Sequence, residues 1–380
     1  MGDVGSVSMC RRIFKEQTSE SGDIPFYKIG TFGGEADAFI SRELFEEYKA
    51  KYPYPKKGDI LISASGSIGR TVEFTGENEY FQDSNIVWLN HDERLDNSFL
   101  KCFYSVVKWA GIEGSTIKRL YNDNILNTTI TLPSVAEQKK IGEYFSIIDH
   151  LITLSQRKID KLKNLKKSML EKMFPKKGTV SPEIRFNGFT NAWEQRKLGN
   201  VAKFSKGSGY SKGDLIESGT PIILYGRLYT KYETSISEVD TYVEAKDGSV
   251  YSKGGEVIVP ASGETAEDIA RAATVDKSGV ILGGDLNVVS PNEDINSAFL
   301  AISISHGNSQ RELAKKAQGK SVVHIHNEEI KNLVVPFPAK AEQNKIVEYF
   351  SNLDNLITLH QRKLDMLKKL KSACLSEMFI

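Results

Sequence analysis

Two long stretches of the chain place apolar residues at alternating steps of three and four. The first runs from Pro133 to Phe174 and the second from Pro338 to Phe379. Such steps line up apolar side chains along one side of a helix, as a seam for a partner helix. Each stretch therefore predicts a helix of about 38 residues, roughly 57 Å long. This is much longer than an ordinary helix of a globular protein.

The seams predict that the two helices pair with each other, and antiparallel pairing would place the blocks before them at opposite ends. A core helix of a bundle is the simpler alternative for such a pattern. Polar residues interrupt both seams, at Ser155 and Lys166 in the first and at His360 and Lys371 in the second. They either fix the register of the pair or lie at its exposed edge. The expected pairing residues are Phe145, Ile148, Ile152, Ile159, Leu162, Phe350, Leu353, Ile357, Leu364 and Leu367.

The signals at the ends of the first helix are clear. Ser134 followed by Glu137 fits a capping box, in which the serine accepts from a free backbone N–H and the glutamate reaches back. Pro175 ends the helix. The second helix has a weaker start, because Ala339 stands in place of Ser134.

The two helical stretches are also copies of one sequence. Roughly 26 of about 42 positions are identical at a constant offset of about 205 residues (338 − 133), without a gap. The similarity extends upstream with decay. Residues 114–133 align with 319–338, and residues 58–69 resemble 254–265. A period this long indicates a duplicated half-protein, in which a variable block precedes a nearly invariant helix.

The variable blocks have the pattern of β-rich domains. They are rich in Gly, Ser, Thr and β-branched residues, with short apolar runs such as Asp59–Ile62 and Glu256–Val259. Short runs separated by turn residues predict many short strands. The expected organisation is a first domain at 1–132, helices at 133–174 and 338–380, a linker at 175–184 and a second domain at 185–337.

Composition narrows the class of protein. The chain has 380 residues, 40% hydrophobic and 26% charged, with a formal net charge of +1. About two domains fit this length. No apolar run approaches the length that spans a bilayer, so we expect no membrane partner. The three scattered cysteines and the polar N-terminus favour the reducing cytoplasm. A near-neutral chain is unsuited to gripping nucleic acid over a wide area by itself.

The chemistry of an enzyme is not evident. The run Gly319–Lys320–Ser321 ends like a phosphate-binding loop, but Ala314 stands where the leading glycine belongs. His324 and His326 would share one face of a strand, but the sequence supplies no third metal ligand. We expect no catalytic residue, no metal and no cofactor. Divergent surfaces on a duplicated scaffold favour a binding protein.

These residues resemble the specificity subunit of type I restriction–modification systems, over nearly the whole chain. The resemblance rests on the two P-x-x-x-E-Q-x-K-I openings at 133–141 and 338–346, on the long helices behind them, and on the segment 185–201. It implies an α+β fold with a pseudo-two-fold internal repeat. Two β-rich, partly β-helix-like target recognition domains would be joined by two long antiparallel coiled-coil helices that act as a ruler.

The resemblance also implies partners and a division of labour. Each recognition domain would read one half of a split double-stranded DNA target, and the helices would set the spacer. The helix length limits the separation to roughly 57 Å, or about 17 base pairs. Two methyltransferase (modification) subunits would bind the chain, and restriction (motor-nuclease) subunits would complete the nuclease. The chain departs from the family pattern in one respect, because its first half lacks a counterpart of Phe186–Lys197.

Base reading requires hydrogen-bonding side chains aimed into a groove, and phosphate contacts require Arg, Lys and hydroxyl groups. Such residues gather in matching loops of the two halves. In the first half they are Arg11, Arg12, Lys15, Tyr27, Lys28, Thr31, Ser63, Ser65, Ser67, Arg70, Lys118, Arg119 and Tyr121. In the second half they are Lys206, Ser208, Tyr210, Lys212, Tyr225, Arg227, Tyr229, Ser262, Glu264, Thr265, Arg271, Lys320, Ser321, His324 and His326. Each could instead be an ordinary solvated surface residue, or, for the tyrosines, a half-buried strand residue.

Two other classes of protein remain open at this point. A coiled-coil scaffold without DNA binding explains the helices, but it does not explain two variable domains on one frame. A self-contained nuclease or methyltransferase needs a cofactor motif that the sequence does not show. For the specificity subunit we expect weak, salt-sensitive DNA binding by the chain alone and tight binding together with the methyltransferase.

Overall fold

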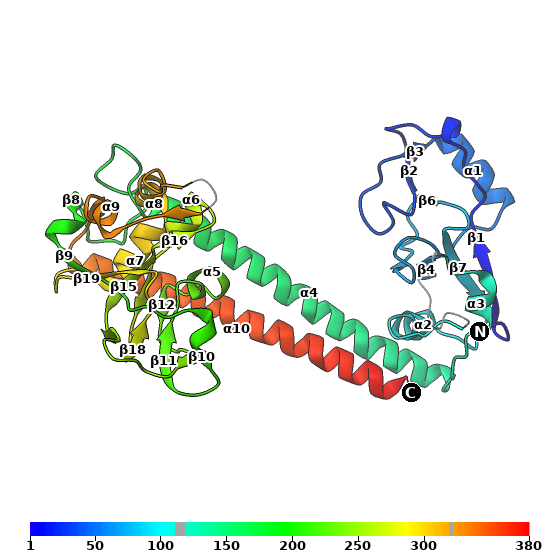
Figure 1. Cartoon of the computed structure of the whole chain (residues 1–380). Coiled ribbons are helices and arrows are strands. Elements are labelled where there is room, and N and C mark those ends of the chain that lie inside the picture. The colour runs from blue at the N-terminus through cyan, green and yellow to red at the C-terminus, as the bar shows by residue number, and fades with distance from the viewer. Residues whose placement is uncertain (111–118, 320–321, 380) are drawn as a thin grey trace. The chain divides into compact units, whose positions relative to one another are not determined.

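The structure is a computed structural model that describes residues 1–110, 119–319 and 322–379 (Figure 1). The chain divides into two compact units. Unit 1 comprises Met1–Arg157 and Gln361–Ile380, and unit 2 comprises Lys158–His360. The two long helices are α4 (Val135–Lys172) and α10 (Lys340–Met378), and each has one part in unit 1 and the other part in unit 2. Their lengths of 38 and 39 residues agree with the sequence expectation.

The described residues of unit 1 form two sheets and three short α-helices. A four-stranded antiparallel sheet has the order β1-β7-β4-β5, and a smaller sheet has the order β3-β2-β6. The strands are β1 (Gly5–Met9), β2 (Ile24–Tyr27), β3 (Phe39–Ile40), β4 (Ile60–Ser63), β5 (Thr71–Glu73), β6 (Tyr80–Phe81) and β7 (Ile86–His91). The short α-helices are α1 (Arg42–Lys51), α2 (Asn97–Tyr104) and α3 (Asn122–Leu126).

Unit 2 contains two five-stranded sheets of order β10-β13-β11-β18-β14 and β12-β17-β15-β19-β9, and the strand pairs β16-β20 and β21-β8. The strands are β8 (Glu194–Lys197), β9 (Ala202–Lys206), β10 (Leu215–Ile216), β11 (Thr220–Ile223), β12 (Ser235–Ile236), β13 (Tyr242–Val243), β14 (Tyr251–Lys253), β15 (Glu256–Pro260), β16 (Ser262–Gly263), β17 (Ala273–Val275), β18 (Ser278–Leu282), β19 (Leu286–Pro291), β20 (Val323–His324) and β21 (Val334–Phe337). The short α-helices are α5 (Arg227–Thr230), α6 (Ala266–Ile269), α7 (Ser297–Ser305), α8 (Gly307–Ala314) and α9 (Asn327–Lys331).

The two units share one arrangement of strands, which we call the frame. The order β1-β7-β4-β5 in unit 1 returns as β9-β19-β15-β17 in unit 2, and β3-β2-β6 returns as β13-β11-β18. The kind of pairing is also repeated, because β2–β6 and β11–β18 are both parallel while β2–β3 and β11–β13 are antiparallel. The many short strands, the α+β class and the internal repeat expected from the sequence are confirmed.

Alternation along the central strands explains how each sheet is covered. In β4, Ile60 and Ile62 face a core that contains Phe99 of α2, whereas Leu61 faces a second core that contains Phe26 and Tyr80. In β15, Val257 and Val259 likewise pack with Phe299 of α7, and Ile258 faces the opposite core. Successive side chains of a strand point to opposite faces, so a continuous apolar run is needed where both faces are buried.

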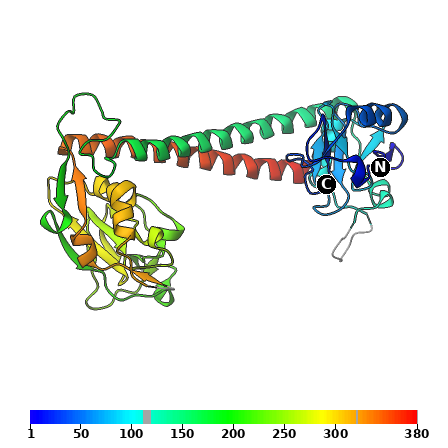
Figure 2. The same ribbon diagram turned by 90° about the horizontal axis from the view of Figure 1, so that it is seen from above.

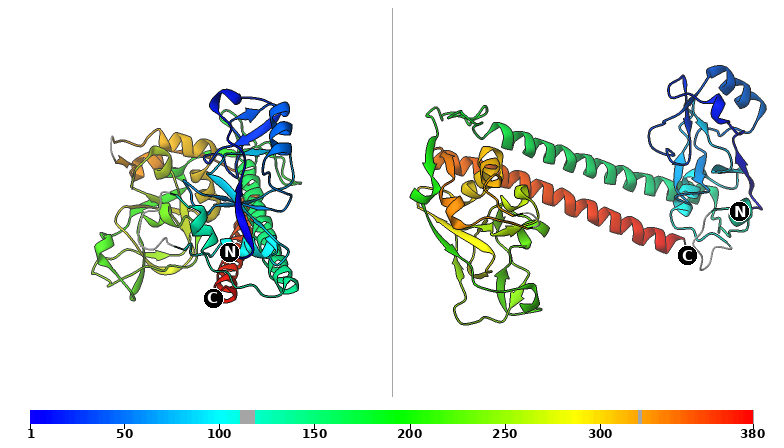
Figure 3. Two further views of the ribbon diagram at one scale, coloured as in Figure 1. Left: turned by 90° about the vertical axis from the view of Figure 1, so that its right-hand side faces the viewer. Right: turned by 45° about the horizontal axis from the view of Figure 1, so that its top comes forward.

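The long helices pack against each other within both units, in opposite chain directions (Figures 2 and 3). The structure buries Phe145, Ile148, Ile159, Leu162, Phe350, Leu353, Leu364 and Leu367, and it half-buries Ile152 and Ile357. At the start of α4, the Oγ of Ser134 accepts from the backbone N–H of Glu137 at 3.3 Å, as the cap signal predicts.

The lysines in the seam are not exposed edge residues, because each is paired with an aspartate of the other helix. Lys166 lies 2.5 Å from Asp354 in unit 2, and Lys371 lies 2.6 Å from Asp149 in unit 1. These two ion pairs are copies of each other, since both residues of one pair map onto the other at the same offset (371 − 166 = 354 − 149 = 205). Only the antiparallel direction in this register forms both pairs.

A buried glutamine joins each long helix to the block that precedes it. The Nε2 of Gln138 donates to the carbonyls of Arg94 and Pro133, and its Oε1 accepts from the N–H of Asp96 at 2.8 Å. Gln343 makes the same three bonds with Asp294, Pro338 and Asn296. These bonds explain the glutamine of the repeated opening motif. The glutamine satisfies backbone groups that burial would otherwise leave without a partner.

Small residues allow close packing at the same junction in unit 1. A Cβ on Gly142 of α4 would lie 1.8 Å from the Oγ of Ser98 and 3.0 Å from its backbone carbon, so α2 approaches the helix too closely for any side chain. The corresponding positions of unit 2 are Val347 and Ala298. In unit 2 the larger side chain lies on the long helix and the smaller one on the short helix, so both junctions remain closely packed.

Strands β8 and β21 have no counterpart among the described residues of unit 1. β8 pairs with β21 over Val334–Phe337 in unit 2. The residues of unit 1 that correspond to β21 are 129–132, and they form no strand. Among the described residues of unit 1, no strand pairs with this segment.

Candidate nucleic-acid interface

An equivalent backbone bridge marks the candidate surface of both units. In unit 1, Ser65 after β4 bridges Arg119, and in unit 2, Ser262 after β15 bridges His324. The serines occupy the same place in the frame, while the second residue has changed from arginine to histidine. The two units therefore present different chemistry at the same point of one scaffold.

The surface of unit 1 is organised by the turn between β6 and β7. The guanidinium of Arg119 donates to the carbonyl of Ser84 at 2.9 Å, and Arg12 forms an ion pair with Asp83 at 2.9 Å. The hydroxyl of Ser65 lies 2.9 Å from Oδ1 of Asn85. Ser84 has a φ of 51°, which is unusual for a residue other than glycine. The turn brings together three candidates that are more than 50 residues apart in sequence.

A hollow of about 360 Å³ adjoins this turn. It is lined by Met9, Ser84, Arg119, Leu120, Tyr121, Asn122 and Asp123. The side chain of Tyr121 is 63% exposed at its rim, which leaves the ring and hydroxyl free for an incoming ligand. Sequence reasoning missed Ser84, Asn85, Asn122 and Asp123. The mapping of Ser65 and Arg119 onto Ser262 and His324 is the signal that could have drawn attention to their neighbours.

The surface of unit 2 is more aromatic. The Oγ of Ser262 lies 3.2 Å from Nδ1 of His324, and the hydroxyl of Tyr229 donates to the carbonyl of Ser262. The exposed rings of His324 and His326 are nearly parallel, with centroids 6.5 Å apart. Tyr225, 38% exposed, packs edge-on against Tyr229. Burial raises the pKa of Tyr229, so its phenol stays protonated and acts as a donor.

The turn that corresponds to Asp83–Asn85 carries two glycines in unit 2. Gly283 and Gly284 pack against the loop that follows β9, where Ser208 forms a bridge with Gly283. A Cβ on Gly207 would lie 1.9 Å from the carbonyl oxygen of Gly283, so only glycine permits this approach. Backbone fills the place where unit 1 presents Asp83 and Ser84, while Asp285, the copy of Asn85, is exposed.

The structure corrects two candidates, because their side chains are buried and make hydrogen bonds within the unit. Arg227 is 9% exposed, and its guanidinium donates to Asp240, Glu233 and the carbonyl of Glu238. Ser63 is 1% exposed, and its hydroxyl accepts from the N–H of Arg70 and donates to the carbonyl of Ser67. Sequence reasoning took both for loop residues facing outward, whereas their hydrogen-bonding capacity is used within the unit.

Several other candidates hold loops in place while remaining accessible. Arg70 donates to the carbonyl of Gly33, Lys28 pairs with Asp37, and Arg11 lies over the ring of Tyr52. Thr31 bonds the backbone of Lys28, and Tyr27 stacks on Phe81. In unit 2, Ser208 accepts from Val250, Tyr210 bonds Ser249, Thr265 caps α6, and Arg271 pairs with Asp268. Lys15, Ser67, Lys206, Lys212 and Glu264 are exposed. Lys118, Lys320 and Ser321 lie outside the described residues.

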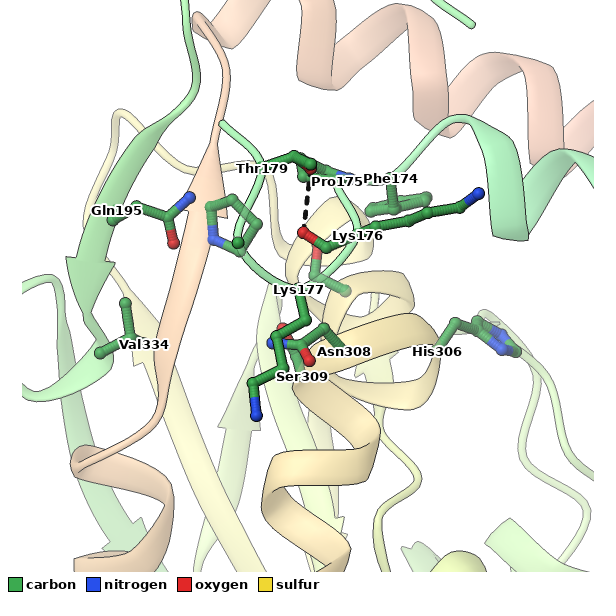
Figure 4. Close-up of a pocket in the computed structure, with 13 residues that line it drawn as sticks. Phe174, Pro175, Lys176, Lys177, Thr179, Gln195, His306, Asn308, Ser309 and Val334 are labelled. Carbon is green, nitrogen blue, oxygen red and sulfur yellow. Dashed lines mark hydrogen bonds between the residues drawn. The ribbon is translucent and has the colours of Figure 1, made fainter. Parts of the chain in front are cut away.

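Unit 2 contains another hollow, which lies away from these surfaces. It measures about 60 Å³ and is formed by the turn after α4 and by α8 (Figure 4). Lys176, Lys177, Thr179 and His306 are among its lining residues, and Thr179 Oγ1 donates to the carbonyl of Lys176. Burial lowers the pKa of His306 to about 4, so its imidazole is neutral near pH 7. The hollow is too small for more than a water or two.

The described residues show no cluster of three or more His, Cys, Asp or Glu side chains placed to hold a metal ion. Burial raises the pKa of Cys10 to about 12 and that of Cys102 to about 11, which makes both poor nucleophiles near neutral pH. Among the described helices, none is both long and apolar enough to cross a bilayer.

Comparison with known proteins gives a consistent result. A family model described as the type I restriction modification DNA specificity domain matches residues 1–164 and 191–369. A putative type I restriction enzyme specificity subunit of Haemophilus influenzae is 62% identical over 156 residues, 41% of this chain and 40% of that protein. A type I restriction enzyme specificity subunit of Methanocaldococcus jannaschii is 25% identical over 329 residues, 83% of this chain and 73% of that protein. The chain thus spans less than half of the first relative.

Solved structures share the fold. The crystal structure of a type I restriction–modification S subunit from M. genitalium covers 100% of this chain and 94% of its own, with a TM-score of 0.57 at 15% identity. A chain from a study of complex assembly and conformational transition of the type I system gives a TM-score of 0.55 at 14% identity, with coverage of 99% and 95%. Because the family model spans most of both repeats, the chain belongs to the type I restriction–modification DNA specificity domain family.

Proposed function

We propose that this chain is the DNA-reading, non-catalytic subunit of a type I restriction–modification complex, and that each unit reads one half of a split double-stranded target. The observation that carries the proposal is the equivalent bridge, Ser65 with Arg119 in unit 1 and Ser262 with His324 in unit 2. Two unlike half-sites require a common frame with different hydrogen-bonding side chains. Arginine favours guanine, while histidine donates or accepts according to its tautomer.

The proposed contacts are the accessible residues around these bridges. In unit 1 they are centred on Arg12, Ser65, Arg119 and Tyr121, beside the hollow of about 360 Å³. In unit 2 they are centred on Tyr225, Ser262, His324 and His326. Tyrosine and histidine rings supply stacking surface as well as hydrogen bonds. Exposed lysines such as Lys15, Lys206 and Lys212 serve as phosphate contacts, which position the protein without reading sequence.

The long helices would set the spacing between half-sites and bind the methyltransferase subunits. Their lengths of 38 and 39 residues support a ruler of roughly 57 Å. Outward-facing leucines support repeated docking. Leu154 and Leu370 are 46% and 43% exposed in unit 1, and their copies Leu359 and Leu165 are 62% and 40% exposed in unit 2. A duplicated apolar face accommodates two copies of one partner.

The docking faces can be tested by stoichiometry. Co-purification with the methyltransferase subunit should give two partner copies per chain. Leu154→Glu with Leu370→Glu should reduce this to one copy, and Leu359→Glu with Leu165→Glu should do the same. Arg119→Ala serves as a control that leaves both faces intact. Retention of two copies by both double variants would exclude these faces as docking surfaces.

Methylation mapping tests the reading function. Co-expression with the methyltransferase subunit, followed by sequencing of modified bases in host DNA, should reveal one split motif that is modified once on each strand. Restriction subunits are expected to add cleavage without changing that motif. A stable complex that yields no chain-dependent motif would reject the proposal in favour of a scaffold without DNA binding.

A further inference from the structure

The loop between β1 and β2 of unit 1 presents an aromatic ring to solvent. Phe14 is 53% exposed and directly precedes a single 3-10 turn, Lys15–Gln17. Outside the long helices, the exposed large apolar side chains in the described part of unit 1 are three aromatic rings, those of Phe14, Tyr52 and Tyr121. One exposed apolar residue is common on a protein surface, so the setting of Phe14 decides whether it has a role.

Hydrogen bonds hold the turn that presents this ring. The N–H of Phe14 donates to Oε1 of Gln17 at 2.9 Å, and the N–H of Gln17 donates to the carbonyl of Phe14 at 3.0 Å. The Nε2 of Gln17 also donates to the hydroxyl of Tyr48 at 3.4 Å, which ties the turn to α1. Because the backbone beside the ring is already fixed, a ligand that contacts the ring loses little affinity to the ordering of this loop.

Unit 2 has the same turn, Lys212–Asp214, with a serine in place of the phenylalanine. Ser211 corresponds to Phe14, since β9 follows β1 at the same offset (202 − 5 = 211 − 14 = 197). The N–H of Ser211 donates to Asp214 at 2.7 Å, and its hydroxyl accepts from the N–H of Gly213 at 3.2 Å. Serine is a favoured capping residue, whereas a phenyl ring accepts no such bond. The formation of the turn therefore does not account for Phe14.

The ring belongs to the candidate surface of unit 1. The charged residues that flank it in sequence are all exposed, and three of the four are cations: Arg11, Arg12, Lys15 and Glu16. Arg12 pairs with Asp83 at 2.9 Å. The next residue of that turn, Ser84, accepts from the guanidinium of Arg119, the bridging residue of unit 1. Cations suit the phosphates of a duplex, whereas an apolar ring finds a matching surface only on the faces of its bases.

We propose that Phe14 is a wedge, whose ring enters a groove of the duplex at the unit 1 half-site and inserts between two adjacent base pairs. This role rests on the proposed function, because it requires that unit 1 reads DNA. An apolar side chain inserted in this way unstacks the base step and bends the duplex. Steps that unstack easily, such as a pyrimidine followed by a purine, are then favoured without a hydrogen bond to any base. Unit 2, with Ser211 at this place, reads its half-site without a wedge.

The test uses the chain in complex with the methyltransferase subunit, and duplexes that carry the motif found by methylation mapping. The fluorescent base 2-aminopurine replaces each adenine of the motif and its flanks in turn, because its emission rises when it is unstacked. We expect the native complex to raise the emission at one step of the unit 1 half-site. Phe14→Ala and Phe14→Ser should both abolish this rise and weaken binding of the duplex about tenfold.

Two further variants separate a wedge from other contacts. Phe14→Leu keeps an apolar side chain that can insert, and it should retain most of both effects. Val180→Ala removes an apolar side chain of unit 2 that is also 53% exposed, and this matched control should change neither effect.

The outcomes distinguish the wedge from the reading function on which it rests. Unchanged emission and binding in a Phe14→Ala complex that still binds the split motif would overturn the wedge and leave the proposed function intact. Release of the methyltransferase subunit from the Phe14→Ala complex would also overturn the wedge, because the ring would then contact protein. A native complex that binds no split motif would reject the proposed function, and the wedge with it.

Discussion

Unit 1 and unit 2 share the order of their central strands and the glutamine that anchors each long helix, but they differ in the side chains of the candidate surface. The bridging residue is Arg119 in one and His324 in the other. In unit 2, β8 pairs with β21 before the long helix, whereas the corresponding described residues of unit 1, 129–132, form no strand. Where the copies agree, the residues build the frame. We propose that the residues that differ at the bridge contact a different half of the target in each unit.

The largest effect is expected from the buried ion pair of unit 2, which has no copy among the described residues of unit 1. Arg185→Ala should destabilise unit 2 by about 3–5 kcal/mol, because the Glu342 carboxylate would stay buried without its partner. Glu342→Ala should also destabilise unit 2, whereas Glu137→Ala, which removes the copy of Glu342, should change the stability of unit 1 by less than about 0.5 kcal/mol. Urea unfolding followed by Trp193 fluorescence, in a chain with Trp88→Phe and Trp109→Phe, measures unit 2, and unfolding followed by Trp88 and Trp109 fluorescence, in a chain with Trp193→Phe, measures unit 1. Equal losses from Glu342→Ala and Glu137→Ala would contradict this difference.

Acid should also weaken unit 2 more than unit 1. His306 has a pKa lowered from 6.5 to about 4 by burial, and its counterpart in unit 1 is Val106. A lowered histidine pKa means that the unfolded chain binds more protons, so stability is full above about pH 6.5 and falls toward pH 4. The loss should reach at most about 3 kcal/mol. His306→Gln should flatten this slope in unfolding measured from pH 7 to pH 4.5. An unchanged slope would assign the acid sensitivity to other groups.

Loss of the anchoring glutamine should reduce stability by the same amount in both units. Gln138→Ala and Gln343→Ala each remove three bonds from a buried junction, and each should destabilise its unit by about 2 kcal/mol. Hydrogen exchange of α2 and α7 provides a local measurement. A loss confined to one junction would show that the two are not energetically equivalent.

The smallest effect is expected from the copied lysine–aspartate pairs. Lys166→Met and Lys371→Met should each change stability by about 1 kcal/mol or less, since both pairs are partly exposed. The double variant should add these values, because the pairs belong to different units. Thermal unfolding of the three variants measures the terms. Strong non-additivity would indicate that the pairs act together on the register of the helices.

Periodicity and repetition made much of the fold predictable. The steps of three and four gave both long helices, and the offset of about 205 residues indicated that the second half repeats the first. The ion pairs of Lys166 and Lys371 were not foreseen, because their aspartate partners lie on the other helix. The strand order followed from no local signal, since strands such as β2 and β6 are separated by more than 50 residues.

The same reasoning predicted the candidate surface only in part. Loop position and side-chain type selected Ser65, Arg119 and His324, but the same criteria also selected Arg227, which the structure buries. Its acceptors Glu233 and Asp240 follow 6 and 13 residues later in the chain. Sequence alone does not show whether an arginine side chain points inward or outward. The organising role of Ser84 depends on a positive φ that no sequence pattern indicates.

If one arrangement of strands carries two independent reading surfaces, a substitution in either unit should alter one half-site alone. This can be measured by methylation mapping of the Arg119→Ala and His324→Ala chains, each co-expressed with the methyltransferase subunit. We expect Arg119→Ala to relax or abolish recognition of bases in one half of the split motif, and His324→Ala to affect only the other half. Changes by either variant in both halves, or in neither, would contradict it.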